Sequence, residues 1–119
     1  MTSRPVGPYT PIVRAGDWLV VSGQVGIVGE KLVTGGVQAE LRQALANLTA
    51  LLESAGASLA DVVKTTLFLR HIDDYIAVNE TYVEAFGDHR PARSAVAVAG
   101  LPLGALVEVE AWAFKKQAG

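Results

Sequence analysis

An arginine and a glutamate stand on two consecutive apolar segments near the end of the chain. Arg93 directly precedes segment 94–99, and Glu108 lies within segment 106–114. A guanidinium presents a planar fork of N–H donors that matches a carboxylate in a two-pronged contact. A glutamate beside an apolar wall can hold a raised pKa and serve as a general acid or base. On the residues alone, pairing of Arg93 and Glu108 with each other or with neighbours is the simpler interpretation.

The other reactive side chains do not form a recognisable catalytic or metal-binding set. His71 and His89 are the only histidines, they lack a metal-ligand spacing, and no cysteine accompanies them. Residues 35–36 are two glycines that precede a helical pattern without the lysine or serine partner of a phosphate-binding loop. Segment 21–24 lacks the glycine that stands two positions before the serine of a hydrolase nucleophile elbow. We therefore expect no metal site, and interpret both histidines as surface loop residues.

Composition excludes further classes of protein. Ten Lys and Arg residues against 12 Asp and Glu residues give a net charge of -2, so the chain has no basic surface for nucleic acid. The absence of cysteine excludes disulfides and thiolate nucleophiles and fits a reducing compartment. No apolar run approaches membrane-spanning length, and residues 1–5 contain no apolar core of a signal peptide. We expect a cytoplasmic protein with neither a membrane nor a nucleic-acid partner.

The hydrophobic pattern predicts a single α+β domain over residues 1–119, with no linker or repeat. The expected elements are strands over 11–14 and 18–23, a meander over 25–33 with its tip at Gly29-Glu30, a helix over 37–55, a strand over 62–70, a helix from Asp73 or Asp74 to Gly87, and strands over 94–99 and 106–114. The carboxylates of Asp73 and Asp74 are expected to cap free backbone N–H groups of the second helix. The order is therefore strands, helix, strand, helix, strands.

Each predicted helix has one apolar stripe. In the first helix the stripe is Val37, Leu41, Leu45, Leu48, Leu52 and Ala55, and the expected surface face carries Gln38, Glu40, Arg42, Gln43, Asn47 and Glu53. In the second helix the expected inner face is Ile76, Asn79, Tyr82, Val83 and Phe86. Two helices of this length cover about one face of a sheet of five or six strands.

The strands are apolar on more surface than these helices can cover. Half of all residues are hydrophobic and only 18% are charged, which leaves little polar surface. In segment 106–114, one face carries Val107, Val109, Ala111 and Ala113, and the other carries Glu108, Glu110, Trp112 and Phe114. We therefore expect helices on one face and neighbouring subunits against the other, in a closed ring or dimer. A monomeric sandwich is the alternative.

A series of short motifs runs along nearly the whole chain. They are Gly7-Pro8-Tyr9, Ser22-Gly23-Gln24, Gln43 with Asn47, Ala55-Gly56, Val63-Lys64, Asn79 with Tyr82 and Phe86, Pro91-Ala92-Arg93-Ser94, Leu101-Pro102, and Val107-Glu108-Val109-Glu110-Ala111. Each motif is commonplace, whereas their order and spacing together are specific. In that order and spacing the chain resembles the reactive intermediate deaminase family, also called Rid or RidA/YjgF.

The resemblance implies a fold, an assembly and an activity. The family's fold is similar to the trimeric kind of chorismate mutase, with a six-stranded mixed sheet and two helices packed on one face. Its three subunits pack their sheets around a barrel-like centre, so the resemblance implies a homotrimer with sites in clefts between subunits. The implied activity is hydrolysis of reactive 2-imino acids, such as 2-iminobutanoate and 2-iminopropanoate, to 2-keto acids and ammonia, without a cofactor.

Site residues follow by position in the motifs. Arg93 resembles the family arginine that grips the carboxylate of a small-molecule substrate, and Glu108 resembles the residue that orients and activates the attacking water. The positions that line the family's pocket correspond to Tyr9, Ser22, Gly23 and Asn79. A structural role is the alternative for three of them: Tyr9 anchors the N-terminal arm, Ser22 ends a strand, and Asn79 caps a loop carbonyl.

The chain departs from the family pattern at two places. Many members carry a cysteine just after the Arg-Ser or Arg-Thr pair, where this chain has Ala95. A thiol-dependent role is therefore absent, while backbone contacts to substrate at Ala95 can remain. Arg90 stands where relatives often place an aromatic residue, and its charge is positioned to reshape the pocket rim.

Two other functions stand beside imine hydrolysis. A binding module that senses keto acids without turnover would need Arg93 and not Glu108. A ribonuclease or translation inhibitor is disfavoured, because the chain is acidic and lacks a basic stripe.

Overall fold

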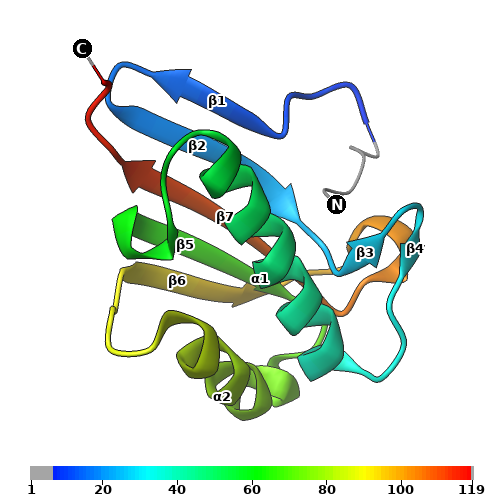
Figure 1. Ribbon diagram of the computed structural model, residues 1–119. Coiled ribbons are helices and arrows are strands. Elements are labelled where there is room, and N and C mark those ends of the chain that lie inside the picture. Colours follow the sequence, from blue (N-terminus) through cyan, green and yellow to red (C-terminus); the bar gives the residue numbers. More distant parts are fainter. Residues whose placement is uncertain (1–6, 119) are drawn as a thin grey trace.

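Two helices cover one face of a five-stranded mixed sheet in the computed structural model, which describes residues 7–118 (Figure 1). The strands are β1 (Ile12–Ala15), β2 (Trp18–Gln24), β3 (Ile27–Val28), β4 (Lys31–Leu32), β5 (Val62–Leu69), β6 (Ala92–Ala97) and β7 (Val107–Phe114), and the helices are α1 (Val37–Ser54) and α2 (Tyr75–Phe86). This confirms the α+β class and the predicted order of elements. Residues 1–5, which are predicted to contain no apolar core of a signal peptide, lie outside the described residues.

The large sheet has the order β1-β2-β7-β5-β6, which is five strands rather than the predicted six. β5 and β6 are parallel and α2 connects them, whereas the other pairs are antiparallel. The predicted meander exists, but β3 and β4 pair only with each other. Asn47 of α1 explains this, because its Nδ2 donates to the carbonyl oxygens of Val25 at 3.2 Å and Ile27 at 2.9 Å. These backbone acceptors are thus satisfied by a side chain instead of a sheet neighbour.

The apolar stripe of α1 packs on β2 and β7. Leu41, Leu45, Leu48 and Leu52 are all buried, as their spacing predicts. Burying a leucine side chain contributes roughly 1.5 to 3 kcal/mol, so this stripe is sufficient to fix the helix on the sheet.

Two residues assigned to the surface face of α1 are instead buried, and that prediction is wrong for them. Glu40 is 6% exposed and Asn47 is 3% exposed. Each binds backbone of another segment: Glu40 Oε1 accepts a hydrogen bond from the Leu106 N–H at 2.8 Å, and Asn47 holds the β3 hairpin. A buried polar side chain is tolerated where it satisfies backbone groups, and only the tertiary structure supplies these partners.

The inner face of α2 also differs from the prediction. Ile76 is 74% exposed and Val83 is 44% exposed, whereas Val78 and Thr81 are buried beside the correctly predicted Tyr82 and Phe86. The face toward α1 is thus buried as well as the face toward the sheet. No side-chain cap from Asp74 is formed, because Asp73 and Asp74 belong to a 3-10 turn, Ile72–Asp74, that leads into the helix. Gly87, with φ 63, ends the helix as predicted.

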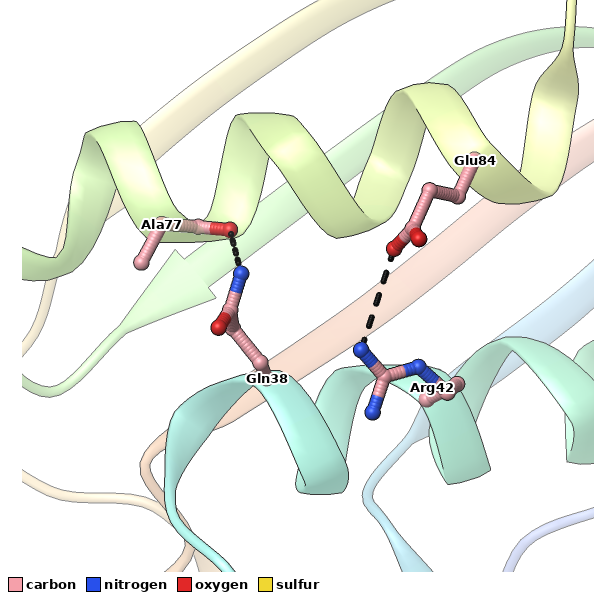
Figure 2. Close-up of polar contacts among 4 residues, drawn as sticks. All are labelled: Gln38, Arg42, Ala77 and Glu84. Carbon is pink, nitrogen blue, oxygen red and sulfur yellow. Dashed lines mark hydrogen bonds and ion pairs between the residues drawn. The ribbon is translucent and has the colours of Figure 1, made fainter.

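Polar contacts join the exposed sides of the two helices (Figure 2). Gln38 Nε2 donates to the carbonyl oxygen of Ala77 at 3.0 Å, and Arg42 lies 3.7 Å from the Glu84 carboxylate. Both side chains of the ion pair are more than 60% exposed, so solvent screens it and it contributes under about 1 kcal/mol.

The opposite face of the sheet is not covered by either helix (Figure 1). We call it the open face. Trp18 and Trp112 meet edge to face at 6.2 Å between ring centroids, and Trp18 meets Phe114 at 5.1 Å. These three rings are between 37% and 46% exposed. Large aromatic side chains thus remain in contact with solvent in the single chain.

Candidate functional site

Glu108 lies on the open face, against an irregularity in β2. Between the pairs Val21↔Ala111 and Gln24↔Val109, β2 contains two residues, Ser22 and Gly23, where β7 contains one. Such a bulge redirects the chain and often lies beside a functional site. A Cβ atom built at Gly23 would lie 2.2 Å from Glu108 Oε2. Glycine at this position is therefore what leaves room for the carboxylate.

The environment of Glu108 favours its neutral form. Burial raises the pKa of this carboxyl above its ordinary value of 4.5, and the negative charge of Glu110 raises it further. A carboxyl with a raised pKa exchanges protons more readily near neutral pH, which is what a general acid or base requires.

Ser22 ties the N-terminal segment to this part of the sheet. Its Oγ donates to the carbonyl oxygen of Thr10 at 2.7 Å, and its N–H donates to the carbonyl oxygen of Pro11 at 2.8 Å. Tyr9 lies one residue before this attachment, and its side chain is 41% exposed. Ser22 lies two residues before the end of β2 rather than at it, and its hydroxyl is engaged by backbone.

Arg93 lies on the other face of the sheet, under α2. Its Nη2 donates to the hydroxyl of Tyr75 at 2.9 Å. Its Cζ lies 5.4 Å from the centroid of the Tyr75 ring and 5.0 Å from that of Tyr82, within the range of cation–π attraction. Among residues 7–118 no carboxylate lies within 4.0 Å of the guanidinium. The arginine is held by two aromatic rings without an acidic partner.

Tyr82 forms a buried wall beside Arg93. Its hydroxyl shares a hydrogen bond of 2.7 Å with Thr65 Oγ1 on β5. Burial raises the pKa of the Tyr82 phenol, while the hydrogen bond to Thr65 and the positive charges of Arg93 and Arg90 oppose that shift. The phenol thus stays neutral at physiological pH.

Asn79 and Ala95 belong to the same face as Arg93. Tyr75, Asn79 and Tyr82 share one side of α2 because they are spaced by four and three residues. The Oδ1 atom of Asn79 is buried with no hydrogen-bond partner in the described part of the chain. Ala95 follows Arg93 by two residues along β6 and pairs with Leu67. A buried acceptor without a partner calls for an explanation, and a bound polar group is one such explanation.

Arg93 and Glu108 are not brought together within one chain. The register places Arg93 opposite Thr65, and Thr65 opposite Ala111, three residues after Glu108. With strands about 4.8 Å apart and a rise of about 3.3 Å per residue, their Cα atoms are roughly 14 Å apart. Side chains an odd number of residues apart on one strand point to opposite faces of the sheet. Glu108 is three residues from Ala111, which shares a face with Arg93, so Glu108 lies on the opposite face from both. The simpler interpretation, a mutual ion pair, is therefore excluded.

The candidate residues thus form two groups. The carboxylate group consists of Glu108 with Ser22 and Gly23 of the β2 bulge, and Tyr9 lies on the segment that Ser22 binds. The guanidinium group consists of Arg93, Ala95 and Asn79. Tyr75, which the sequence analysis did not single out, joins the guanidinium group through its hydroxyl. Its spacing of four residues from Asn79 is the one sequence signal that could have identified it.

Arg90 and His89, which lie shortly before Arg93 in the chain, both interact with backbone carbonyl groups. Arg90 Nη1 donates to the carbonyl oxygens of Gly87 and His89 and so binds the C-terminal end of α2, which is favourable for a cation. His89 Nε2 lies 2.7 Å from the carbonyl oxygen of Val62, and its side chain is half-buried. His89 lies in a loop, as predicted, and this hydrogen bond holds it against the start of β5.

A shallow recess between the helices is lined by Arg42, Thr81, Glu84 and Ala85, away from both groups. No three His, Asp or Glu side chains of residues 7–118 are arranged to hold a metal ion. Neither α1 nor α2 is long and apolar enough to cross a bilayer.

Comparison with known proteins places these residues in a family. The family model described as Endoribonuclease L-PSP matches residues 1–115. A RutC family protein of Pyrococcus horikoshii is 44% identical over 116 residues, which cover 95% of this chain and 91% of that protein. The human 2-iminobutanoate/2-iminopropanoate deaminase is 42% identical over 112 residues, which cover 92% of this chain and 82% of the human protein.

Solved structures agree. RidA from an Antarctic Psychrobacter species superposes with a TM-score of 0.91 at 37% identity, and the match covers 95% of this chain and 93% of that one. The resemblance predicted from the motifs is confirmed, and this chain belongs to the Endoribonuclease L-PSP family, also known as the RidA/YjgF family.

Proposed function

We propose that the protein hydrolyses reactive 2-imino acids, such as 2-iminobutanoate and 2-iminopropanoate, to 2-keto acids and ammonia. The observation that carries this proposal is the guanidinium of Arg93, which is oriented by Tyr75 and Tyr82 and has no carboxylate partner in the described chain. A cation held in this way is suited to the carboxylate of a small substrate. The printed name of the human relative supports the same substrate class.

The site of this proposal is made by two copies of the chain. The guanidinium group of one copy faces the carboxylate group of its neighbour, since one chain places these groups on opposite faces of its sheet. β6 lies at the edge of the sheet, and the open face exposes Trp18, Trp112 and Phe114 to a neighbour. A closed homotrimer satisfies both requirements, because each subunit then contributes each group once.

The chemistry needs no group beyond these residues. Arg93 binds the substrate carboxylate and fixes the C2 atom of the protonated imine. The Glu108 carboxylate accepts a proton from water as the water oxygen bonds to C2, which gives a carbinolamine. Glu108 then returns that proton to the nitrogen. The C–N bond breaks as the carbinolamine hydroxyl gives its proton back to the Glu108 carboxylate, and ammonia leaves the 2-keto acid and takes that proton from Glu108 as ammonium, which restores the carboxylate.

A second candidate is binding of keto acids without turnover. The separation of Arg93 from Glu108 within one chain favours it, because the guanidinium group alone is sufficient for carboxylate binding. In that case Glu108→Gln would retain affinity for 2-oxobutanoate, and the wild-type protein would not accelerate hydrolysis.

The decisive experiment couples the purified protein to threonine dehydratase, which supplies the imine, and follows release of 2-oxobutanoate and ammonia. We expect the wild type to accelerate release and Arg93→Ala and Glu108→Gln to abolish that acceleration. Circular dichroism establishes that each variant is folded. A wild-type protein that leaves the rate unchanged but binds 2-oxobutanoate by calorimetry would replace the proposal with the binding function.

A further inference from the structure

We propose that Tyr75 is a positioning residue for Arg93: its hydroxyl fixes the guanidinium so that the remaining N–H groups face the substrate carboxylate. The inference rests on the proposed function and goes beyond it, because it assigns a role to a residue outside the motifs that identify the family. It starts from the hydrogen bond of 2.9 Å from Arg93 Nη2 to the Tyr75 hydroxyl oxygen.

The two tyrosines beside Arg93 do different things. Tyr82 is 4% exposed, and its hydroxyl is engaged by Thr65 at 2.7 Å, so toward Arg93 it presents a ring fixed in place. Tyr75 is 39% exposed, and its hydroxyl binds Arg93 itself. The ring of Tyr82 therefore limits the position of the guanidinium, whereas the hydroxyl of Tyr75 sets its rotation.

Rotation matters because a guanidinium has several donor edges. It carries five N–H groups, and a two-pronged contact with a carboxylate uses two of them. In the described chain Arg93 donates to one side-chain acceptor, Tyr75, and this bond uses one N–H of Nη2. The other N–H groups stay available, and their direction is fixed before the substrate arrives.

A fixed arginine binds its ligand more tightly than a mobile one. A free arginine side chain loses rotamer entropy when it is ordered, and this loss weakens binding when it occurs in the binding step. The hydroxyl of Tyr75 and the ring of Tyr82 order the Arg93 side chain during folding, so part of this entropy is lost before the substrate binds. Because the carboxylate is unchanged during hydrolysis, the benefit is equal in the ground state and the transition state, and it affects KM rather than kcat.

The experiment compares Tyr75→Phe with the wild type in the dehydratase-coupled assay and in calorimetry with 2-oxobutanoate. Phenylalanine keeps the ring and removes only the hydroxyl. We expect KM and the Kd for 2-oxobutanoate to rise together by about three- to tenfold, the usual effect of one hydrogen bond, with kcat unchanged within twofold. A merely structural role would lower the melting temperature and leave this split unobserved.

The matched control is Ser54→Ala, which also removes one hydrogen-bonded hydroxyl, at the C-terminal end of α1 and away from Arg93. We expect it to leave KM and kcat unchanged. Arg93→Ala reports on the proposed function separately. If Arg93→Ala abolishes activity while Tyr75→Phe leaves KM and Kd unchanged or lowers them, the role of Tyr75 is overturned and the function stands. If the wild type neither hydrolyses the imine nor binds 2-oxobutanoate, both proposals fail.

Discussion

Arg93 and Glu108 lie on opposite faces of one sheet, with β5 between their strands. The two side chains best suited to imine hydrolysis can therefore act on one substrate only if two copies of the chain contribute them. An assembly of at least two copies is therefore a requirement of the proposed mechanism. It also makes the mechanism testable by mixing inactive variants.

Arg93→Ala and Glu108→Gln are each expected to be inactive alone and to restore activity when refolded together. In a random mixture of equal amounts, about one quarter of the clefts between subunits receive an intact arginine from one subunit and an intact glutamate from its neighbour. We therefore expect about one quarter of the wild-type activity in the coupled assay. Each variant refolded alone is the control. Absence of any restored activity in a mixture shown to form mixed oligomers would mean that both residues act from one chain.

Gly23→Ala should reduce activity much more than stability. The added methyl group would meet Glu108 Oε2 at 2.2 Å, and this flexible carboxylate can swing away without disturbing the backbone. A displacement of the carboxylate by about 1 Å is expected to cost up to about 100-fold in kcat, with only a small change in the melting temperature.

Gly26→Ala provides the matched control. The added Cβ there would lie 2.4 Å from the backbone oxygen of Glu40, which cannot move without shifting α1. We expect the opposite result, a clearly lower melting temperature. Equal effects of the two substitutions on thermal stability would contradict this account of the β2 bulge.

Sequence patterns predicted the elements better than their faces. Periodicity located α1 correctly, yet Glu40 and Asn47 are buried because they bind backbone of distant segments, which no local pattern encodes. The same limit applies to Ile76, which lies outside on α2 because the helix also packs on α1. The predicted sixth strand is absent from the large sheet because the strands of the meander, β3 and β4, pair only with each other.

The site was predictable in part. Position in the motifs singled out Arg93 and Glu108, and whether the other residues named with them act in the site stays a prediction. The face occupied by Arg93 was not predictable, because both sides of segment 94–99 are small or apolar and only the register with β5 distinguishes them. Tyr75 was missed because it belongs to none of the motifs, and only its spacing of four residues from Asn79 connects it with them.

Glu108 should make the folded protein less stable as pH rises. Its pKa is raised on folding, first by burial and then by Glu110, so the folded state holds the proton more tightly than the unfolded state. The stabilisation is complete below the ordinary value of 4.5 and is lost as pH rises through the folded pKa. We therefore expect Glu108→Gln to stabilise the protein relative to the wild type at pH 7 and to confer less advantage at pH 4, in urea unfolding at both values. Equal advantage at both would contradict the raised pKa.

The same reasoning predicts a shift in the pH profile of Glu110→Gln. Removing this negative charge lowers the pKa of Glu108, and the base form then persists to lower pH. We expect the acidic limb of kcat/KM against pH to move to lower pH, while burial keeps the pKa of Glu108 above its ordinary value. A limb that moves to higher pH, or stays in place, would show that Glu108 is not the base that this limb reports.

Trp112→Glu should separate the subunits without unfolding them. Trp112 is 46% exposed on the open face and meets Trp18 edge to face, and Trp18 meets Phe114 in the same way, so these rings form an aromatic patch that a neighbour could bury. A carboxylate buried at such a contact would lose its hydration without a partner, which is strongly unfavourable. The chain's own core lies on the other face and does not depend on this side chain.

In sedimentation at micromolar concentration we expect the wild type as an oligomer and Trp112→Glu as a folded species of 12.5 kDa without deaminase activity. A wild type that sediments at 12.5 kDa would remove the second copy on which the proposed site depends. An active monomeric variant would do the same, since it would join guanidinium and carboxylate within a single chain.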